Sequence, residues 1–256
     1  MNLTDIFKDS LKYPISDMTK FSIFGIVMLL SALGSLSFGN AAIDGILVII
    51  SFVALIISLG YGIAITRSAI EKSDEIPDLN LETTIVDGLK MVVLSIVYYI
   101  IPTIIVIILA FATGLFDYVV EILGYLNQYG PEFANMIPDD LILSMMSSAA
   151  ITMLVAFILM VIFSFLYYMG VCRLAKYNSL SAGADIPEAA RDLKKVGIGR
   201  VIGWAVLLVI LIFIFNLIGG FIGLIPYVGV LISGFLISTY ISFMIYRSVG
   251  LLYADI

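Results

Sequence analysis

Six long apolar segments constrain the fold of this chain more than any other feature. A helix that crosses a hydrocarbon core of roughly 30 Å needs about 20 residues. The apolar segments approach or exceed that length and occupy residues 21–38, 43–66, 91–115, 143–171, 198–218 and 224–246. Within these bounds only Asp44 and Arg200 are charged, and each lies close to the end of its segment. We therefore predict six transmembrane helices.

Composition and residue pattern favour helices in lipid over the alternatives. The chain is 62% hydrophobic and 12% charged, whereas soluble chains average about 45–50% and about 25%. Backbone amides in lipid must find partners within their own helix or within a closed barrel. Barrel strands alternate over about ten residues, and a run such as "IIPTIIVIILAFA" does not alternate. The predicted fold class is all-α, a polytopic membrane helix bundle that forms a single domain over residues 1–256.

The distribution of charge predicts the orientation of these helices. With six spans, all 13 basic residues fall on one side of the membrane. They lie in the N-terminal tail, in the links after the second and fourth spans, and at the C-terminal end. Basic residues concentrate in cytoplasmic loops, so we expect both termini in the cytoplasm. Six acids lie toward the other side and carry the whole net charge of −6.

A short motif of an aspartate and a lysine precedes the first, third and fifth spans and indicates an internal repeat. Its three copies are Asp9-Ser10-Leu11-Lys12, Asp87-Gly88-Leu89-Lys90 and Asp192-Leu193-Lys194. Each copy precedes two spans that end in an arginine, and these arginines are Arg67, Arg173 and Arg247. A serine stands nine residues before each arginine, at Ser58, Ser164 and Ser238.

We interpret this pattern as three tandem hairpins, since internal repeats are common in polytopic membrane proteins. The repeats occupy about residues 1–72, 73–178 and 179–256. The middle repeat is enlarged by an acidic outer loop at about 116–142. Chance similarity in so narrow a composition is the alternative interpretation.

An amphipathic segment, here called a lead-in, comes before each hairpin. Its apolar face in the second repeat carries Leu81, Ile85, Val86 and Leu89, and in the first repeat Leu3, Ile6, Phe7 and Leu11. We expect interfacial helices with this face toward lipid. For the second and third repeats, segments that simply lengthen the spans are the alternative. Pro14 should end the first lead-in, and Ser16 should cap the first span. Pro77 and Pro187 suit first helical turns.

The chain resembles an uncharacterised family of multi-pass archaeal membrane proteins, frequent in methanogens and known only as a domain of unknown function. The resemblance covers nearly the whole chain and rests chiefly on the motif at 87–90, on Ile101-Pro102, and on Pro226 with Gly229. Leu79 and Met18 depart from the family, which commonly has an aromatic residue at both places. The resemblance implies an archaeal plasma membrane, and it implies no activity, cofactor or catalytic residue.

Two interpretations are open for the arginines at the ends of the hairpins. Arg67, Arg173 and Arg247 are candidate contacts for anionic lipid headgroups or for an acidic ligand. Alternatively, they anchor helix ends, because an arginine can extend toward the interface and bond the last carbonyls. We favour anchoring, since the bias of basic residues toward the cytoplasm alone predicts it.

Several uncharged positions are candidates for a polar site at the middle of the membrane. Ser58, Ser164 and Ser238 lie about 13 Å from the arginines at 1.5 Å per residue. They could line a solute path, but small residues spaced by four, as in Ala54-Ser58-Gly62, favour close helix packing. Pro102 could build a midplane site. A kink is favoured, in which Thr103 or a neighbouring helix bonds the carbonyl freed near Tyr98. Asn216 is open to both interpretations.

The outer connections carry local structure signals. Glycines and Pro226 in 216–229 predict a tight turn, with a re-entrant loop as the alternative. Residues 118–125 have helical apolar spacing and should form a helix on the outer surface. Asp139-Asp140 should begin a helix. A weak cation site is the functional alternative for these outer acids.

The inventory of reactive groups is small. With no His and one Cys, the chain offers no Ser-His or Cys-His pair and no His-Cys metal cluster. It also has no phosphate-binding loop and no basic patch for nucleic acid. We therefore expect no enzyme, cofactor or metal. The preferred function is a membrane or envelope component that contacts lipids, a membrane protein or a second copy. The alternatives are a permease for a small neutral or amphiphilic solute, and an enzyme if Asp117, Glu121, Asp139 and Asp140 converge on a metal.

Overall fold

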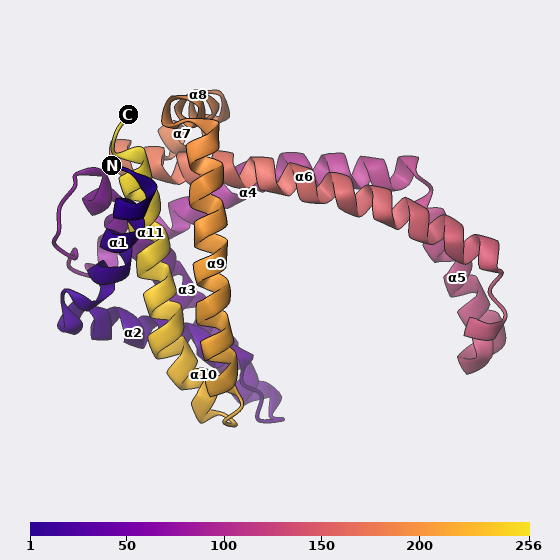
Figure 1. The fold of residues 1–256 in the computed structure, drawn as a ribbon. Helices are drawn as coiled ribbons and strands as arrows, with labels where there is room; N and C mark the ends of the chain where they lie inside the picture. The colour runs from indigo at the N-terminus through magenta and orange to yellow at the C-terminus, as the bar shows by residue number, and fades with distance from the viewer. The chain divides into compact units, whose positions relative to one another are not determined.

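The computed structural model describes residues 1–256, and all of its regular elements are helical (Figure 1). The α-helices are α1 Leu3–Lys12, α2 Met18–Ala32, α3 Ala41–Ile70, α4 Leu81–Ala112, α5 Leu115–Tyr129, α6 Asp139–Tyr177, α7 Leu180–Gly183, α8 Ile186–Val196, α9 Ile198–Gly223, α10 Val228–Ile232 and α11 Thr239–Tyr253. The shorter elements are the 3-10 helices η1 Tyr13–Ile15, η2 Leu33–Ser35 and η3 Gly130–Asn135, and the π-helix η4 Ser233–Ser238.

Six segments are long and apolar enough to cross a membrane, which confirms the predicted number of spans. They are Met18–Ser35, Ala41–Ile70, Leu81–Ala112, Asp139–Tyr177, Ile198–Gly223 and Val228–Tyr253. The chain divides into two compact units. Unit 1 comprises Met1–Ser95 and Leu166–Ile256, and unit 2 comprises Ile96–Phe165. Both termini lie at the same end of unit 1, where the Met1 amino group pairs with Asp255 (Figure 1).

The start of α2 differs from the prediction. Asp17, not Ser16, caps this helix, and its carboxylate accepts the N–H groups of Thr19 and Lys20 at 3.0 and 3.1 Å. Asp17 has the extended backbone that an N-cap needs, whereas Ser16 stays in the right-handed region. The Ser16 hydroxyl instead donates to the carbonyl of Tyr13. The prediction for Pro14 is confirmed, because α1 ends at Lys12.

The three lead-ins end differently from one another. α1 is separated from α2 by η1, and α8 is separated from α9 at Gly197, whose φ of 97° suits glycine. α4, by contrast, is continuous from Leu81, so the second lead-in lengthens its span. Pro187 lies in the first turn of α8 as predicted. The prediction for Pro77 is wrong, because α4 begins only after Asn80, whose side chain accepts the N–H of Thr83.

The buried faces of the lead-ins also differ from the prediction. α1 packs against α11 and α9 and buries Ile6 and Phe7 within the protein. In α4 the predicted apolar face is exposed, and the face with Thr84, Asp87 and Gly88 is buried. A methyl group at Gly88 would overlap the carbonyl oxygen of Ile56 in α3. The second lead-in therefore packs on α3 through close approach of the two backbones, and its predicted apolar face does not take part in this contact.

An aromatic cluster forms the core of unit 1 beside this contact. It joins η1, α2, α3 and α11 through Tyr13, Phe21, Phe24, Tyr61 and Phe243. The Phe24 ring lies 5.3 Å from the Phe243 ring and 4.7 Å from the Tyr61 ring, measured between centroids. On α9, the indole N–H of Trp204 donates to the Ser248 hydroxyl at 3.1 Å.

Unit 2 consists of the second part of α4, then α5 and η3, and the first part of α6. The hydroxyls of Tyr99 and Ser164 lie 3.2 Å apart, and Ser148 donates to the carbonyl of Thr113 at 2.8 Å. These pairs show that the two long helices run in opposite directions. α5 confirms the predicted helix at 118–125, and α6 begins at Asp139 as expected.

The connection between α9 and α10 is a tight turn, as predicted. It occupies residues 224–227, and a methyl group at Gly229 would overlap the carbonyl oxygen of Ile222. The π-helix η4 that follows was not predicted.

Candidate functional site: the ion-pair belt of unit 1

Each of the three boundary arginines pairs with the aspartate of a lead-in motif. Arg67 Nη2 lies 3.3 Å from Asp87, Arg173 Nη1 lies 2.8 Å from Asp192, and Arg247 Nε lies 2.6 Å from Asp9. The first arginine thus takes the second motif, the second arginine takes the third, and the third arginine takes the first. We call these three pairs the ion-pair belt.

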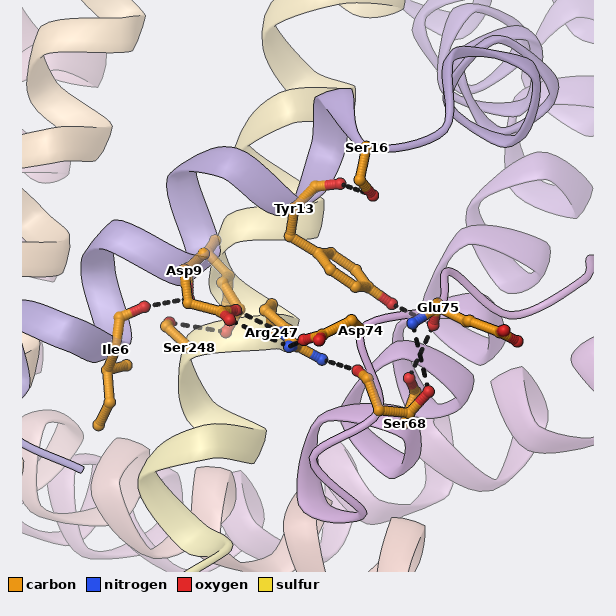
Figure 2. Close-up of polar contacts among 12 residues, drawn as sticks. Ile6, Asp9, Tyr13, Ser16, Ser68, Asp74, Glu75, Arg247 and Ser248 are labelled. Carbon is orange, nitrogen blue, oxygen red and sulfur yellow. Dashed lines mark hydrogen bonds and ion pairs between the residues drawn. The ribbon is translucent and has the colours of Figure 1, made fainter.

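Arg247 is the most deeply buried member of the belt, with 1% of its side chain exposed. Its Nε and Nη2 contact both carboxylate oxygens of Asp9, at 2.6 and 3.2 Å, and Nη2 also reaches Asp74 at 3.3 Å (Figure 2). Nη1 donates to the carbonyl of Ser73. The guanidinium carbon lies 4.4 Å from the centre of the Tyr13 ring, within cation–π range. α1, α11 and the link before α4 therefore meet at one cation.

Tyr13 extends this contact into the link between α3 and α4. Its hydroxyl donates to the carbonyl of Glu75 at 3.0 Å, and the Ser68 hydroxyl donates to the same carbonyl at 3.0 Å (Figure 2). Burial raises the pKa of the Tyr13 phenol, so it stays a neutral donor at physiological pH. These bonds hold the link against α1.

Asp192 is the centre of the second pair. It accepts hydrogen bonds from Arg173 at 2.8 Å, from Lys195 at 2.9 Å and from the Tyr253 hydroxyl at 2.6 Å. Burial alone would raise the pKa of Asp192, but the three bonds outweigh it and lower the pKa. The carboxylate is therefore held in its charged form between α6, α8 and α11.

In the first pair, Asp87 is the shared acceptor, as Asp192 is in the second. Besides Arg67, it pairs at 2.8 Å with Lys90, the residue three positions later in α4. Lys195 has the same spacing from Asp192. The structure therefore aligns Lys195, and not the predicted Lys194, with Lys90.

The arginines also donate to backbone carbonyls, but these carbonyls lie outside their own helices. Arg67 Nε donates to Ala175 at 3.0 Å, and Arg173 Nε donates to Ala182 at 2.9 Å. Exposure of the side chain falls from 34% at Arg67 to 11% at Arg173. The arginines thus join separate segments, and the anchoring interpretation stays a prediction. Contact of these arginines with lipid headgroups stays a prediction.

A second charged cluster, which no motif indicated, surrounds Asp255. The Met1 amino group, Lys72 and Arg200 all pair with this carboxylate, at 2.8, 3.1 and 3.0 Å. The hydrogen bond from the amino group, followed by those from Arg200 and Lys72, holds the pKa of Asp255 well below its usual range. Sequence reasoning missed Asp255 because its partners are distant along the chain.

The three midplane serines do not gather into one polar site. Ser58 donates to the carbonyl of Leu55 in its own helix. Ser164 lies in unit 2, where it contacts Tyr99 and donates to Met160. Of the three serines, only Ser238 lines a pocket. This pocket is open to the surface, has a volume of about 250 Å³, and is also lined by Ala32, Gly219, Gly223, Val230, Ser233 and Gly234. A second pocket of about 350 Å³ lies between α2 and α3 and includes none of the three serines.

Glycines leave room for close contact between helices at two places, and the packing role of the serines stays a prediction. A methyl group at Gly62 would overlap the Tyr246 ring, and one at Gly234 would press on Ala32. Asn216 donates to Ile212 in its own helix. The Thr103 hydroxyl bonds the carbonyl of Tyr99. Repair of the helix near Tyr98 by Thr103 or by a neighbouring helix stays a prediction.

Potential metal ligands do not cluster. No group of three or more His, Cys, Asp or Glu side chains is placed to hold a metal ion. The outer acids Asp117, Glu121, Asp139 and Asp140 thus do not converge as the metal-dependent alternative required. The single thiol, Cys172, is buried and lies 3.6 Å from the carbonyl of Val249.

The six apolar spans define the class of this chain as a polytopic integral membrane protein. The chain belongs to the DUF4013 family, described as a protein of unknown function, whose profile matches residues 43–224. This match covers more than half of the chain and agrees with the resemblance to a domain of unknown function. No match was found among curated proteins or solved structures. The archaeal origin stays a prediction.

Proposed function

We propose that this chain is a non-enzymatic component of the cell membrane that acts through contacts with lipids or with another membrane protein. The observation that carries the proposal is the ion-pair belt. Its buried charges are satisfied within the protein, as at Arg247, where every guanidinium nitrogen has a partner. The outward surfaces of the spans are apolar and suit lipid. The belt thus serves as a scaffold that holds these surfaces in place.

We further propose that the scaffold is built from three tandem repeats of one hairpin and its lead-in. The pairing order supports this, because each arginine takes the motif of the next repeat and the last arginine returns to the first. Burial at matched positions supports it as well. The residues three before and four after each aspartate are buried in all three copies: Ile6 and Tyr13, Thr84 and Met91, Ala189 and Val196. If the three repeats form a closed ring, the last repeat contacts the first, and this accounts for the pairing of α11 with α1.

The proposed orientation places the belt and both termini in the cytoplasm. Single cysteines at Gln128 and Arg191, both exposed, test it in intact cells. The native Cys172 is buried and gives a low background. We expect an impermeant thiol reagent to label Gln128→Cys from outside, and Arg191→Cys only after the membrane is opened. Labelling of both positions from the same side overturns the six-span topology.

The function itself is tested by purification and reconstitution. We expect the wild-type chain to retain native lipid or a stoichiometric protein partner when it is isolated in mild detergent and examined by native mass spectrometry. Isolation of the chain alone, together with solute uptake after reconstitution in liposomes, contradicts the proposal.

A permease for a small neutral or amphiphilic solute is the second candidate. The observation that favours it is the pocket between α2, α9 and η4, where Ser233 and Ser238 supply hydroxyls. Under this alternative, filling the pocket with Gly219→Leu abolishes uptake, while Gly45→Leu, in open space, leaves uptake unchanged. Uptake that is absent from the wild-type chain removes this candidate.

A further inference from the structure

α5 has a complete apolar stripe that no part of the protein covers. The residues of this stripe are exposed and follow helical spacing along one side: Phe116, Val119, Val120, Leu123 and Leu126. None of the 15 residues of α5 is buried. The acids Asp117 and Glu121 lie on the other side of the helix, so the two faces differ sharply in polarity.

The apolar stripe of α5 continues the lipid-facing surface of α4. Only Thr113 and Gly114 separate the two helices, and Gly114 makes the turn with a φ of 72°. Across this turn the rings of Phe111 and Phe116 lie 4.3 Å apart, and both side chains are exposed. On α4, Ile108 and Phe111 share one exposed face. The surface that meets lipid on the span thus passes directly onto the first turn of α5.

The charge of α5 and of the loop after it determines which lipid headgroups the polar face of α5 can lie beside. Residues 115–138 contain the acids Asp117, Glu121 and Glu132 and no basic residue. Helices that lie on membranes generally use basic residues to attract anionic headgroups. Here the same electrostatics repel such headgroups. The polar face therefore suits water above neutral headgroups.

We propose that α5 is an interfacial helix whose apolar stripe lies in the outer leaflet at the headgroup boundary, on neutral lipid in preference to anionic lipid. This rests on the proposed membrane topology. A 15-residue helix is about 22 Å long at 1.5 Å per residue, so α5 contacts the bilayer surface over this whole length beside the outer end of the α4–α6 pair. The partner that covers the apolar stripe is the lipid bilayer.

Two neighbouring residues of α5 give a matched test in the full chain. Single cysteines at Val120 and Glu121 are labelled with an environment-sensitive fluorophore in nanodiscs of phosphatidylcholine that hold one chain each. We expect a blue-shifted emission at Val120→Cys that a lipid-borne spin label quenches. At Glu121→Cys we expect a red-shifted emission that aqueous acrylamide quenches. Equal access of acrylamide to both positions overturns the proposal, as does shielding of Val120→Cys from both quenchers.

Lipid charge gives the second arm of the test. Replacing a third of the phosphatidylcholine by phosphatidylglycerol should reduce lipid quenching at Val120→Cys. Adding Asp117→Asn and Glu121→Gln to that variant should remove the reduction. Quenching that does not respond to lipid charge contradicts the preference for neutral lipid. If Val120→Cys faces water while Gln128→Cys and Arg191→Cys still label from opposite sides, the interfacial helix fails but the topology stands.

Discussion

Unit 1 and unit 2 are both built from apolar helices, yet different forces hold them. In unit 1 the belt pairs and the Asp255 cluster join separate segments of the chain, and the Arg247–Asp9 pair joins residues 238 positions apart. Unit 2 contains no basic residue, so no side-chain ion pair can form within residues 96–165. Its helices meet through hydroxyl bonds such as Ser148 to Thr113. Because lipid is as apolar as leucine, helices in a membrane gain little from apolar contact alone. Charge and close approach therefore specify unit 1 much more strongly than hydroxyls specify unit 2.

The largest expected effect comes from removing the buried arginine of unit 1. Arg247→Met leaves Asp9 and the carbonyl of Ser73 without their partner, and breaking a buried pair costs about 3–5 kcal/mol. Unfolding in detergent can be followed by the fluorescence of Trp204, the only tryptophan. The exposed Arg191–Glu188 pair provides the control, since Arg191→Met should cost about 0–1 kcal/mol. Equal losses for the two variants would show that the belt is not a stabilising element.

A smaller loss is expected from separating α3 and α4 in unit 1. Gly60→Ala places a methyl group on the carbonyl oxygen of Thr84, and overpacking of this kind costs roughly 1–3 kcal/mol. Gly45→Ala is the matched control in the same helix, where nothing lies within 4 Å. It should be neutral or stabilising by up to about 1 kcal/mol, because alanine is the better helix former. A wild-type unfolding midpoint for Gly60→Ala contradicts the close-approach argument.

Acid should weaken unit 1 with a more modest effect. The pKa values of Asp192 and Asp255 are lowered in the folded protein. Stability from a lowered pKa is present above the unfolded value, about 3.9 for aspartate. It is lost as the pH falls through the lower folded value. We expect the Trp204 unfolding midpoint to decline below about pH 4. Asp192→Asn should be less stable at neutral pH, and its unfolding midpoint should decline less steeply in acid. If the midpoint of this variant falls with pH as steeply as that of the wild-type chain, Asp192 is not a source of the acid sensitivity.

The smallest effect is expected in unit 2. Ser148→Ala removes the hydroxyl bond to Thr113, and such bonds between membrane helices contribute about 0.6 kcal/mol on average. Amide hydrogen exchange of α6 should report a loss of this size. Ser147→Ala is the control, because the Ser147 hydroxyl bonds only its own helix, at Ser144. A loss of several kcal/mol at Ser148 would mean that unit 2 is specified as strongly as unit 1.

Local signals in the sequence predicted local structure well. The end of α1 at Pro14, the helix over 118–125 and the turn at Pro226 all follow from the chemistry of neighbouring residues. The cap of α2 was misplaced by one residue, because Ser16 and Asp17 are both good capping residues and only the backbone conformation distinguishes them. The π-helix η4 had no sequence signal that we recognised.

The site was predicted in part. Its arginines and its aspartates were both singled out, the former as helix ends and the latter as repeat markers, but they were not paired with each other. The pairing joins residues up to 238 positions apart, and no local pattern encodes such a partner. Asp255 was missed for the same reason.

By itself the sequence determined the six spans, because a helix in lipid satisfies its own backbone and needs only length and an absence of charge. The tertiary structure alone decided which face of each lead-in is buried. In α4 the leucine face is exposed, and Asp87 and Gly88 are buried. In water an apolar stripe would have identified the core, but lipid removes that preference. Buried charge and close backbone approach then choose the contact, and both depend on partners that only the folded chain brings together.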